Sequence, residues 1–157
     1  MAVYVSVIGS GEATAEQVED AEAVGRLLAG AGAVVVCGGR GGVMEAACRG
    51  AAAEGGVTVG LLADADRAHA NPFLTVSVPT GMGELRNGLV ARAGDAVIAI
   101  AGEFGTLSEI GFALKLGRPV VGLGTWELAR GGRPVAAIEV ASGPQEAVAR
   151  ALALARR

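Results

Sequence analysis

The chain has 157 residues, 52% of them hydrophobic, and a formal net charge of -3 at pH 7. Glycine or a charged side chain interrupts every apolar run before the roughly 18 positions that a membrane span needs, and no basic leader precedes the first apolar run, so we expect a cytoplasmic protein with no membrane contact. The arginines are scattered along the chain, which argues against nucleic acid as a partner.

Short apolar runs alternate with helical patterns along the whole chain, which is typical of βαβ units. The first strand is predicted at residues 3–8, and a capping box at Thr14 and Gln17 opens a helix that reaches residue 31. A continuous β-branched run predicts a second strand at 34–37, buried on both faces. Further strands are predicted at 57–62, 74–78, 95–100, 120–123 and 135–140, and further helices at 43–54, 84–93, 106–116 and from Ser142 onward.

This order of elements predicts one domain over residues 1–157. The fold class that we predict is α/β: a Rossmann-like three-layer αβα sandwich around a mostly parallel sheet of about seven strands. The irregular stretch after the third strand, with Asp64, Asp66, Arg67 and Asn71 before Pro72, is predicted to be the most mobile loop.

Three glycine-rich turns each follow a predicted strand and precede a helix. The carboxyl ends of parallel strands share one edge, where helix N-termini offer unpaired N–H groups to an anion and glycine lets a phosphate reach the backbone. We therefore expect a phosphate-binding site there, although tight packing of strands on helices explains any single turn equally well. The candidate binding residues in these turns are Gly9, Ser10, Gly11, Gly38, Gly39, Arg40, Gly41, Gly42, Gly102, Gly105 and Thr106.

Several common sites are excluded by the sequence. No G-x-x-x-x-G-K-[ST] motif is present, and Thr14 stands where a dinucleotide-binding G-x-G-x-x-G needs its third glycine. The second strand ends at Cys37 without an acidic residue for a ribose diol. Cys37, Cys48 and the single His69 do not have zinc spacing, so we expect two free thiols and no metal site.

The segment GEFGTLSE at 102–109 resembles the G-G-x-G-T-x-x-E signature of the LOG/SLOG superfamily, which includes the LONELY GUY (LOG) phosphoribohydrolases and the molybdenum-cofactor carrier proteins. GGRGGVM at 38–44 is similar to the G-G-x-x-G-x-M turn of that superfamily, and LRN at 85–87 precedes the fifth strand. The resemblance spans nearly the whole chain and is nearest to the small bacterial, carrier-like branch.

In the hydrolase branch, the resemblance implies that the signature turn binds a nucleotide 5'-phosphate while an arginine and a glutamate assist cleavage of the N-glycosidic bond. By motif position these residues are Arg86 and Glu109. The carboxylate could stabilise an oxocarbenium-like sugar or position water, and the arginine could orient phosphate or base. Ala101 and Glu103 depart from the hydrolase pattern, which places a negative charge close to the phosphate site and favours binding without catalysis.

Structural explanations compete at the same positions. Thr106 and Glu109 have the spacing of a capping box, Arg86 could be a solvated helix residue, and Asn87 could anchor a turn as well as contact a ligand. Arg40 lies inside a glycine turn, where a guanidinium suits a phosphate.

Three functions stay open at this point. The first is a carrier or binding protein for a small phosphorylated ligand, either a nucleotide or a molybdopterin-type cofactor, with no further cofactor required. The second is a LOG-like nucleoside 5'-monophosphate phosphoribohydrolase that uses Arg86 and Glu109, and the third is a nucleotide-sensing regulatory module. The resemblance also implies a homodimer or a higher homo-oligomer.

Overall fold

The computed structural model describes residues 1–156 and contains a seven-stranded sheet in which every neighbouring pair is parallel. The strand order is β4-β3-β2-β1-β5-β6-β9. This arrangement confirms the predicted Rossmann-like α/β fold. The strands are β1 (Tyr4–Gly9), β2 (Val34–Cys37), β3 (Thr58–Leu62), β4 (Val76–Pro79), β5 (Ala96–Ile100), β6 (Val120–Leu123) and β9 (Ile138–Val140).

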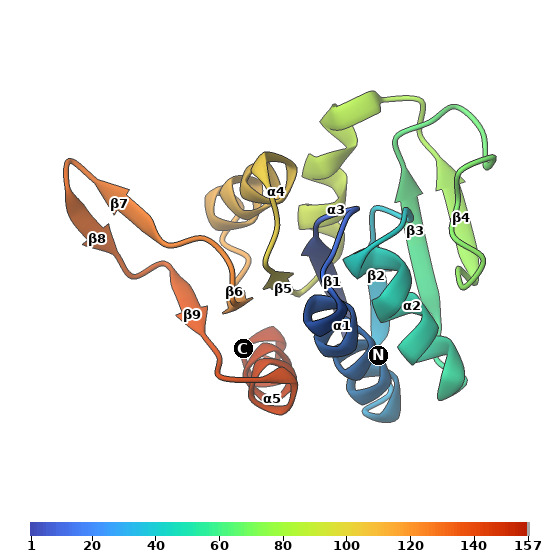
Figure 1. The fold of residues 1–157 in the computed structure, drawn as a ribbon, viewed down its shortest axis with the longest axis horizontal. Coiled ribbons are helices and arrows are strands. Elements are labelled where there is room, and N and C mark those ends of the chain that lie inside the picture. Colours follow the sequence, from blue (N-terminus) through green and yellow to red (C-terminus); the bar gives the residue numbers. More distant parts are fainter. Residues whose placement is uncertain (157) are drawn as a thin grey trace.

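Five α-helices cover the two faces of this sheet (Figure 1). They are α1 (Ala15–Gly30), α2 (Val43–Ala53), α3 (Asn87–Ala93), α4 (Phe104–Lys115) and α5 (Pro144–Ala155). Residues of α1, α2 and α5 form one buried cluster with β1 and β5, whereas residues of α3 and α4 form a second. Side chains of β5 alternate between the two clusters: Ala96, Ile98 and Ile100 join the first, and Val97 and Ala99 the second.

β4 and α5 each begin two residues later than predicted, and three other elements also differ from the sequence-based prediction. The helix predicted at 84–93 begins as a 3-10 turn, η1 (Gly83–Arg86), and continues as α3. The predicted strand 135–140 is divided: β8 (Arg133–Val135) pairs antiparallel with β7 (Leu128–Arg130), and only β9 joins the main sheet. Figure 1 shows the β7–β8 hairpin extending away from the body of the molecule. The third difference concerns the start of α4 and is described with the site.

The strand order reverses direction between β1 and β5. From β1 the chain builds outward through β2, β3 and β4, and from β5 it builds the other way through β6 and β9. In open α/β sheets, ligands bind outside the carboxyl ends of the strands at such a point. Within residues 1–156, no helix combines the length and apolar character needed to cross a membrane.

Candidate functional site

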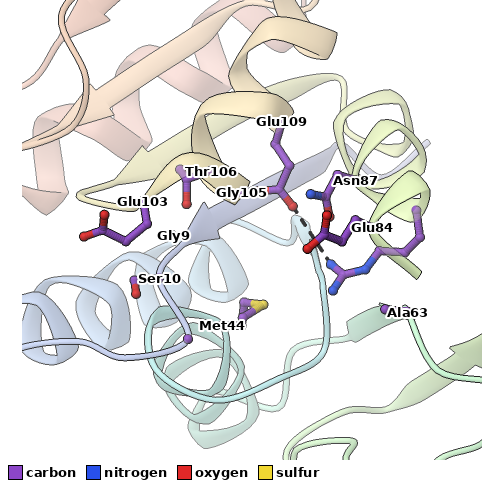
Figure 2. A pocket seen from close by; sticks show the side chains of 12 residues that line it. Gly9, Ser10, Met44, Ala63, Glu84, Asn87, Glu103, Gly105, Thr106 and Glu109 are labelled. Atoms are coloured by element: carbon purple, nitrogen blue, oxygen red, sulfur yellow. Dashed lines mark ion pairs between the residues drawn. The ribbon is translucent and has the colours of Figure 1, made fainter. Parts of the chain in front are cut away.

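A cavity of about 240 Å³ lies at the carboxyl ends of β1 and β5, and we name it the Arg86 pocket. Residues far apart in the sequence meet in it, as Figure 2 shows. Its lining consists of Gly9, Ser10, Gly11, Met44, Ala63, Glu84, Arg86, Asn87, Glu103, Gly105, Thr106 and Glu109. The first and third glycine turns therefore meet at one cavity.

The N-terminus of α4 opens onto the Arg86 pocket through Gly105 and Thr106. The N-cap residue is Glu103, whose side chain makes no capping hydrogen bond, and the Leu107 N–H already bonds to the Glu103 carbonyl. The helix thus begins at Phe104, and the alternative explanation of Thr106 and Glu109 as a capping box is wrong because both lie inside the helix. Without a side-chain cap, the first N–H groups and the positive end of the helix dipole can meet an anion.

The turn that leads into α4 has an unusual backbone. Ala101 has a φ of 45°, a region that residues with a Cβ atom rarely adopt, and Gly102 has a φ of 100°. A Cβ atom on Gly102 would lie 2.4 Å from the Cβ of Thr106. Glycine at 102 therefore lets the chain leave β5 and enter α4 close beside Thr106.

The first glycine turn is held tightly between β5 and α2. A Cβ atom on Gly9 would lie 2.6 Å from the Ile100 carbonyl oxygen, and the Val43 N–H donates to the Ser10 carbonyl at 3.0 Å. The Glu12 N–H donates to the Ser10 hydroxyl at 3.1 Å. These contacts fix Gly9 and Ser10 at the rim of the pocket.

The second glycine turn supports the site without lining the cavity. A Cβ atom on Gly38 would lie 2.1 Å from Arg86 Nη1, so the missing side chain makes room for the Arg86 guanidinium. The Gly39 N–H donates to Cys37 Sγ, and Gly42 packs against the Ser10 carbonyl. A Cβ atom on Gly41 would lie 3.5 Å from the Gly11 carbonyl oxygen.

Arg40 is engaged on another side of this turn. Its Nη2 atom donates to both carboxylate oxygens of Asp64, at 2.8 and 2.7 Å, and its carbonyl accepts from Asn71. Asn71 also donates its N–H to the Gly39 carbonyl, so the irregular stretch after β3 is bound to the second glycine turn. The structure therefore places Arg86, rather than Arg40, against the cavity.

Arg86 and Glu109 form a buried pair in the pocket. Arg86 Nη1 lies 4.0 Å from Glu109 Oε1, the contact drawn as a dashed line in Figure 2, and the residues are 9% and 7% exposed. Arg86 Nε is buried with no hydrogen-bond partner among residues 1–156. The solvated-helix explanation for Arg86 is thus wrong, because its side chain is buried at the pocket rather than exposed to solvent.

Burial dominates the electrostatics of this pair. It raises the pKa of Glu109 to about 8, although the neighbouring Arg86 acts in the opposite direction. It also lowers the pKa of the Arg86 guanidinium, which Glu109 partly offsets. At neutral pH the Glu109 carboxyl group therefore keeps its proton and can donate a hydrogen bond.

This protonation makes the stability of the protein pH-dependent. Between pH 4.5, the ordinary pKa of Glu109, and pH 8, the folded state holds a proton that the unfolded state releases, so stability is lost as pH rises through this window. We expect Glu109→Gln to gain roughly 3 kcal/mol in free energy of unfolding relative to wild type between pH 5 and pH 8. Urea unfolding of both proteins at the two pH values measures this; parallel changes in the two proteins would contradict it.

Asn87 links the two helices at the pocket. Its side-chain amide donates to the Ser108 hydroxyl at 3.0 Å, and that hydroxyl donates to the Gly105 carbonyl at 2.6 Å. Asn87 also lines the cavity, so anchoring and ligand contact are both open to it. Sequence reasoning did not identify Ala63, which directly follows β3, or Glu84, which lies in η1, because neither belongs to a motif. Met44 belongs to the quoted G-G-x-x-G-x-M turn.

The fold and site define a Rossmann-like protein with an uncapped helix N-terminus, a glycine turn and a buried arginine at the topological switch point. The family model of the SLOG cluster4 family matches residues 2–151. The chain belongs to the SLOG cluster4 family, and this confirms the superfamily expected from the sequence.

Three proteins illustrate this relationship. An uncharacterised protein from Archaeoglobus fulgidus is 40% identical over 121 residues, which are 77% of this chain and 80% of the relative. The molybdenum cofactor binding protein from Rippkaea orientalis has a similar structure, with a TM-score of 0.88, 29% identity and 98% of each chain covered. The molybdenum cofactor carrier protein from Chlamydomonas reinhardtii has a TM-score of 0.84 and 26% identity, with both chains fully covered.

Proposed function

We propose that this protein binds a small phosphate-bearing molecule, a nucleotide or a molybdopterin-type cofactor, as a carrier or binding protein. The observation that carries the proposal is the Arg86 pocket, in which Arg86 and the uncapped start of α4 face one cavity. The names of the Rippkaea and Chlamydomonas proteins support a molybdenum cofactor as one candidate ligand.

The donors suit a phosphate group. Arg86 is the cationic side chain in the pocket lining. The amides of Gly105 and Thr106 at the start of α4 supply neutral donors beside it. A protonated Glu109 does not repel the anion, so the pocket holds less negative charge at neutral pH than its sequence suggests.

One experiment tests the proposal and separates it from catalysis. The purified protein is incubated with nucleoside monophosphates and pterin phosphates, and both binding and released base are measured. We expect micromolar or tighter binding of at least one ligand with no base release. Absence of binding across the panel would overturn the proposal.

A phosphoribohydrolase is the second candidate, because Arg86 and Glu109 are buried together in one pocket. A carboxyl group with a pKa of about 8 could act as a general acid toward a leaving base. Base release that disappears in a folded Glu109→Gln variant would favour this function over the carrier. Release unaffected by the substitution would remove Glu109 from the mechanism.

We also propose a cytoplasmic homodimer or higher homo-oligomer. Leu85 and Phe104 are 73% and 76% exposed, and both lie beside the residues that form the pocket. Exposed apolar side chains of this size are typical of an interaction surface. Sedimentation at micromolar concentration is expected to give at least twice the monomer mass, and a monomer would contradict the assembly.

A further inference from the structure

A second hollow of about 420 Å³ adjoins the Arg86 pocket, and we name it the Trp126 pocket. Ser10 and Glu103 line both pockets, so the two hollows meet across these residues. The remaining lining of the Trp126 pocket consists of Glu12, Gln17, Ala101, Gly102, Gly124, Thr125 and Trp126. A ligand whose phosphate occupies the Arg86 pocket could extend into this second hollow.

Four side chains in the lining of the Trp126 pocket carry hydrogen-bond donors, those of Ser10, Gln17, Thr125 and Trp126, and two of the four already donate to protein acceptors. The Thr125 hydroxyl donates to the Ala101 carbonyl at 2.6 Å, and the Trp126 indole N–H donates to the Glu103 carbonyl at 3.2 Å. A ligand that enters this hollow cannot use these hydrogens without breaking an existing bond.

The carboxylates of Glu12 and Glu103, by contrast, are not engaged with protein groups among residues 1–156. Within the described part of the chain, neither carboxylate accepts a hydrogen bond or forms an ion pair, although both residues line the hollow. Figure 2 shows the Glu103 carboxylate pointing away from Glu109. Ionised carboxylates only accept hydrogen bonds, so the hollow favours a ligand group that supplies N–H or O–H donors.

The two pockets differ in the charges that surround them. Next to the Trp126 pocket is a third hollow lined by Glu16 and Asp20, and burial together with Glu16 and Glu19 raises the pKa of Asp20. This side of the site therefore disfavours an anion, whereas the Arg86 pocket holds a buried guanidinium. The phosphate of a ligand is therefore assigned to the Arg86 pocket, and the part of the ligand that carries N–H or O–H donors is assigned to the Trp126 pocket.

One aromatic side chain, that of Trp126, lines the second hollow. Its ring centroid lies 5.5 Å from that of Phe104, which is outside the lining, and the indole hydrogen bond to the Glu103 carbonyl fixes the orientation of Trp126. Aromatic side chains provide stacking surfaces for planar heterocycles.

We propose that the Trp126 pocket is a subsite for a planar ring with a 2-amino-4-oxo edge, whose N–H donors are bound by Glu12 and Glu103. Guanine nucleotides and pterin phosphates share this edge, which presents adjacent ring N–H and amino donors to a carboxylate. The inference rests on the proposed function, since the phosphate must occupy the Arg86 pocket.

The test compares ligands that differ in one group. Calorimetry measures the binding of ribose 5-phosphate, guanosine, inosine and adenosine 5'-monophosphates, and a pterin monophosphate to wild type and to Glu12→Gln, Glu103→Gln and Glu16→Gln. Inosine monophosphate lacks the 2-amino group. We expect wild type to bind the guanine or the pterin ligand roughly tenfold or more tightly than inosine monophosphate. Whichever of guanosine monophosphate and the pterin monophosphate binds more tightly shows which of the two ring systems the pocket prefers.

The variants decide whether the carboxylates cause this discrimination. Glu103→Gln or Glu12→Gln is expected to reduce the ratio to about threefold or less, and Glu12→Gln, whose site lies outside the Arg86 pocket, is expected to do so without weakening ribose 5-phosphate. Glu16→Gln, which removes a nearby charge outside the hollow, is expected to keep the ratio. Equal binding of all bases, or a ratio that survives both substitutions, would overturn the inference alone. Failure of wild type to bind ribose 5-phosphate and every other ligand would overturn the proposed function and the inference with it.

Discussion

Arg86→Gln is expected to weaken binding of ribose 5-phosphate by roughly 10- to 100-fold, which corresponds to the loss of a charged hydrogen bond in a buried site. The free energy of unfolding is expected to stay within about 1 kcal/mol of wild type or to rise, because the substitution removes a buried charge with an unpartnered Nε. Calorimetry and urea unfolding measure the two quantities on the same samples.

The matched control is Arg92→Gln. Arg92 lies in the last turn of α3, on the exposed surface, and does not line the pocket. Its substitution is expected to change the affinity by less than about twofold. An Arg86→Gln variant that binds as tightly as this control would show that the pocket arginine does not hold the phosphate.

Much of the fold could be predicted because the buried strands carry continuous apolar runs bounded by glycine. The predicted strands at 3–8, 34–37, 95–100 and 120–123 agree with β1, β2, β5 and β6 to within one residue at each end. Their burial on both faces explains this agreement, since no polar alternation obscures such runs. The shared edge of the glycine turns followed from the parallel topology.

The C-terminal strands and the start of α4 were harder to predict for local reasons. Gly131 and Gly132 both have positive φ and close a hairpin, but the sequence does not show that β8 pairs with β7 rather than with the main sheet. The TLSE segment has the spacing of a capping box, yet the Leu107 N–H bonds to Glu103 and the helix begins earlier. A local pattern alone cannot distinguish the first turn of a helix from its second.

Contacts between residues far apart in the sequence decide which arginine forms the buried pair with Glu109. Gly38 makes room for the Arg86 guanidinium, although the two residues are far apart in the sequence. Sequence reasoning favoured Arg40, which lies inside a glycine turn, over Arg86 as the arginine that binds phosphate. The Asp64 carboxylate, which engages Arg40, and the burial of Arg86 distinguish the two arginines only in the folded chain.

Protonation of Glu109 would let a pocket rich in carboxyl groups accept the anion that we propose. Glu84, Glu103 and Glu109 all line it, but burial keeps a proton on Glu109 at neutral pH. Glu103 carries its charge toward the adjoining Trp126 pocket, away from Glu109. Of the three, Glu103 alone also lines the second hollow, whereas Glu84 and Glu109 line only the Arg86 pocket.

Gly102→Ala is expected to lower the free energy of unfolding by roughly 2 to 5 kcal/mol, because strain at a positive φ and overpacking act together. The new Cβ atom would lie 2.4 Å from the Thr106 Cβ, so α4 must shift or Thr106 must move. Either movement displaces amides at the pocket, and the affinity for ribose 5-phosphate is expected to fall as well. Urea unfolding and calorimetry measure both effects.

Gly111→Ala is the control for this substitution. Gly111 lies in the same helix, and a Cβ atom there would meet nothing within 4 Å, so the variant is expected to be as stable as wild type or more stable by about 1 kcal/mol. Because both variants add one methyl group to a glycine near or within α4, the difference between them isolates the geometry of the turn. Equal stability of the two variants would show that the Gly102 turn relaxes freely and that its backbone does not fix the start of α4.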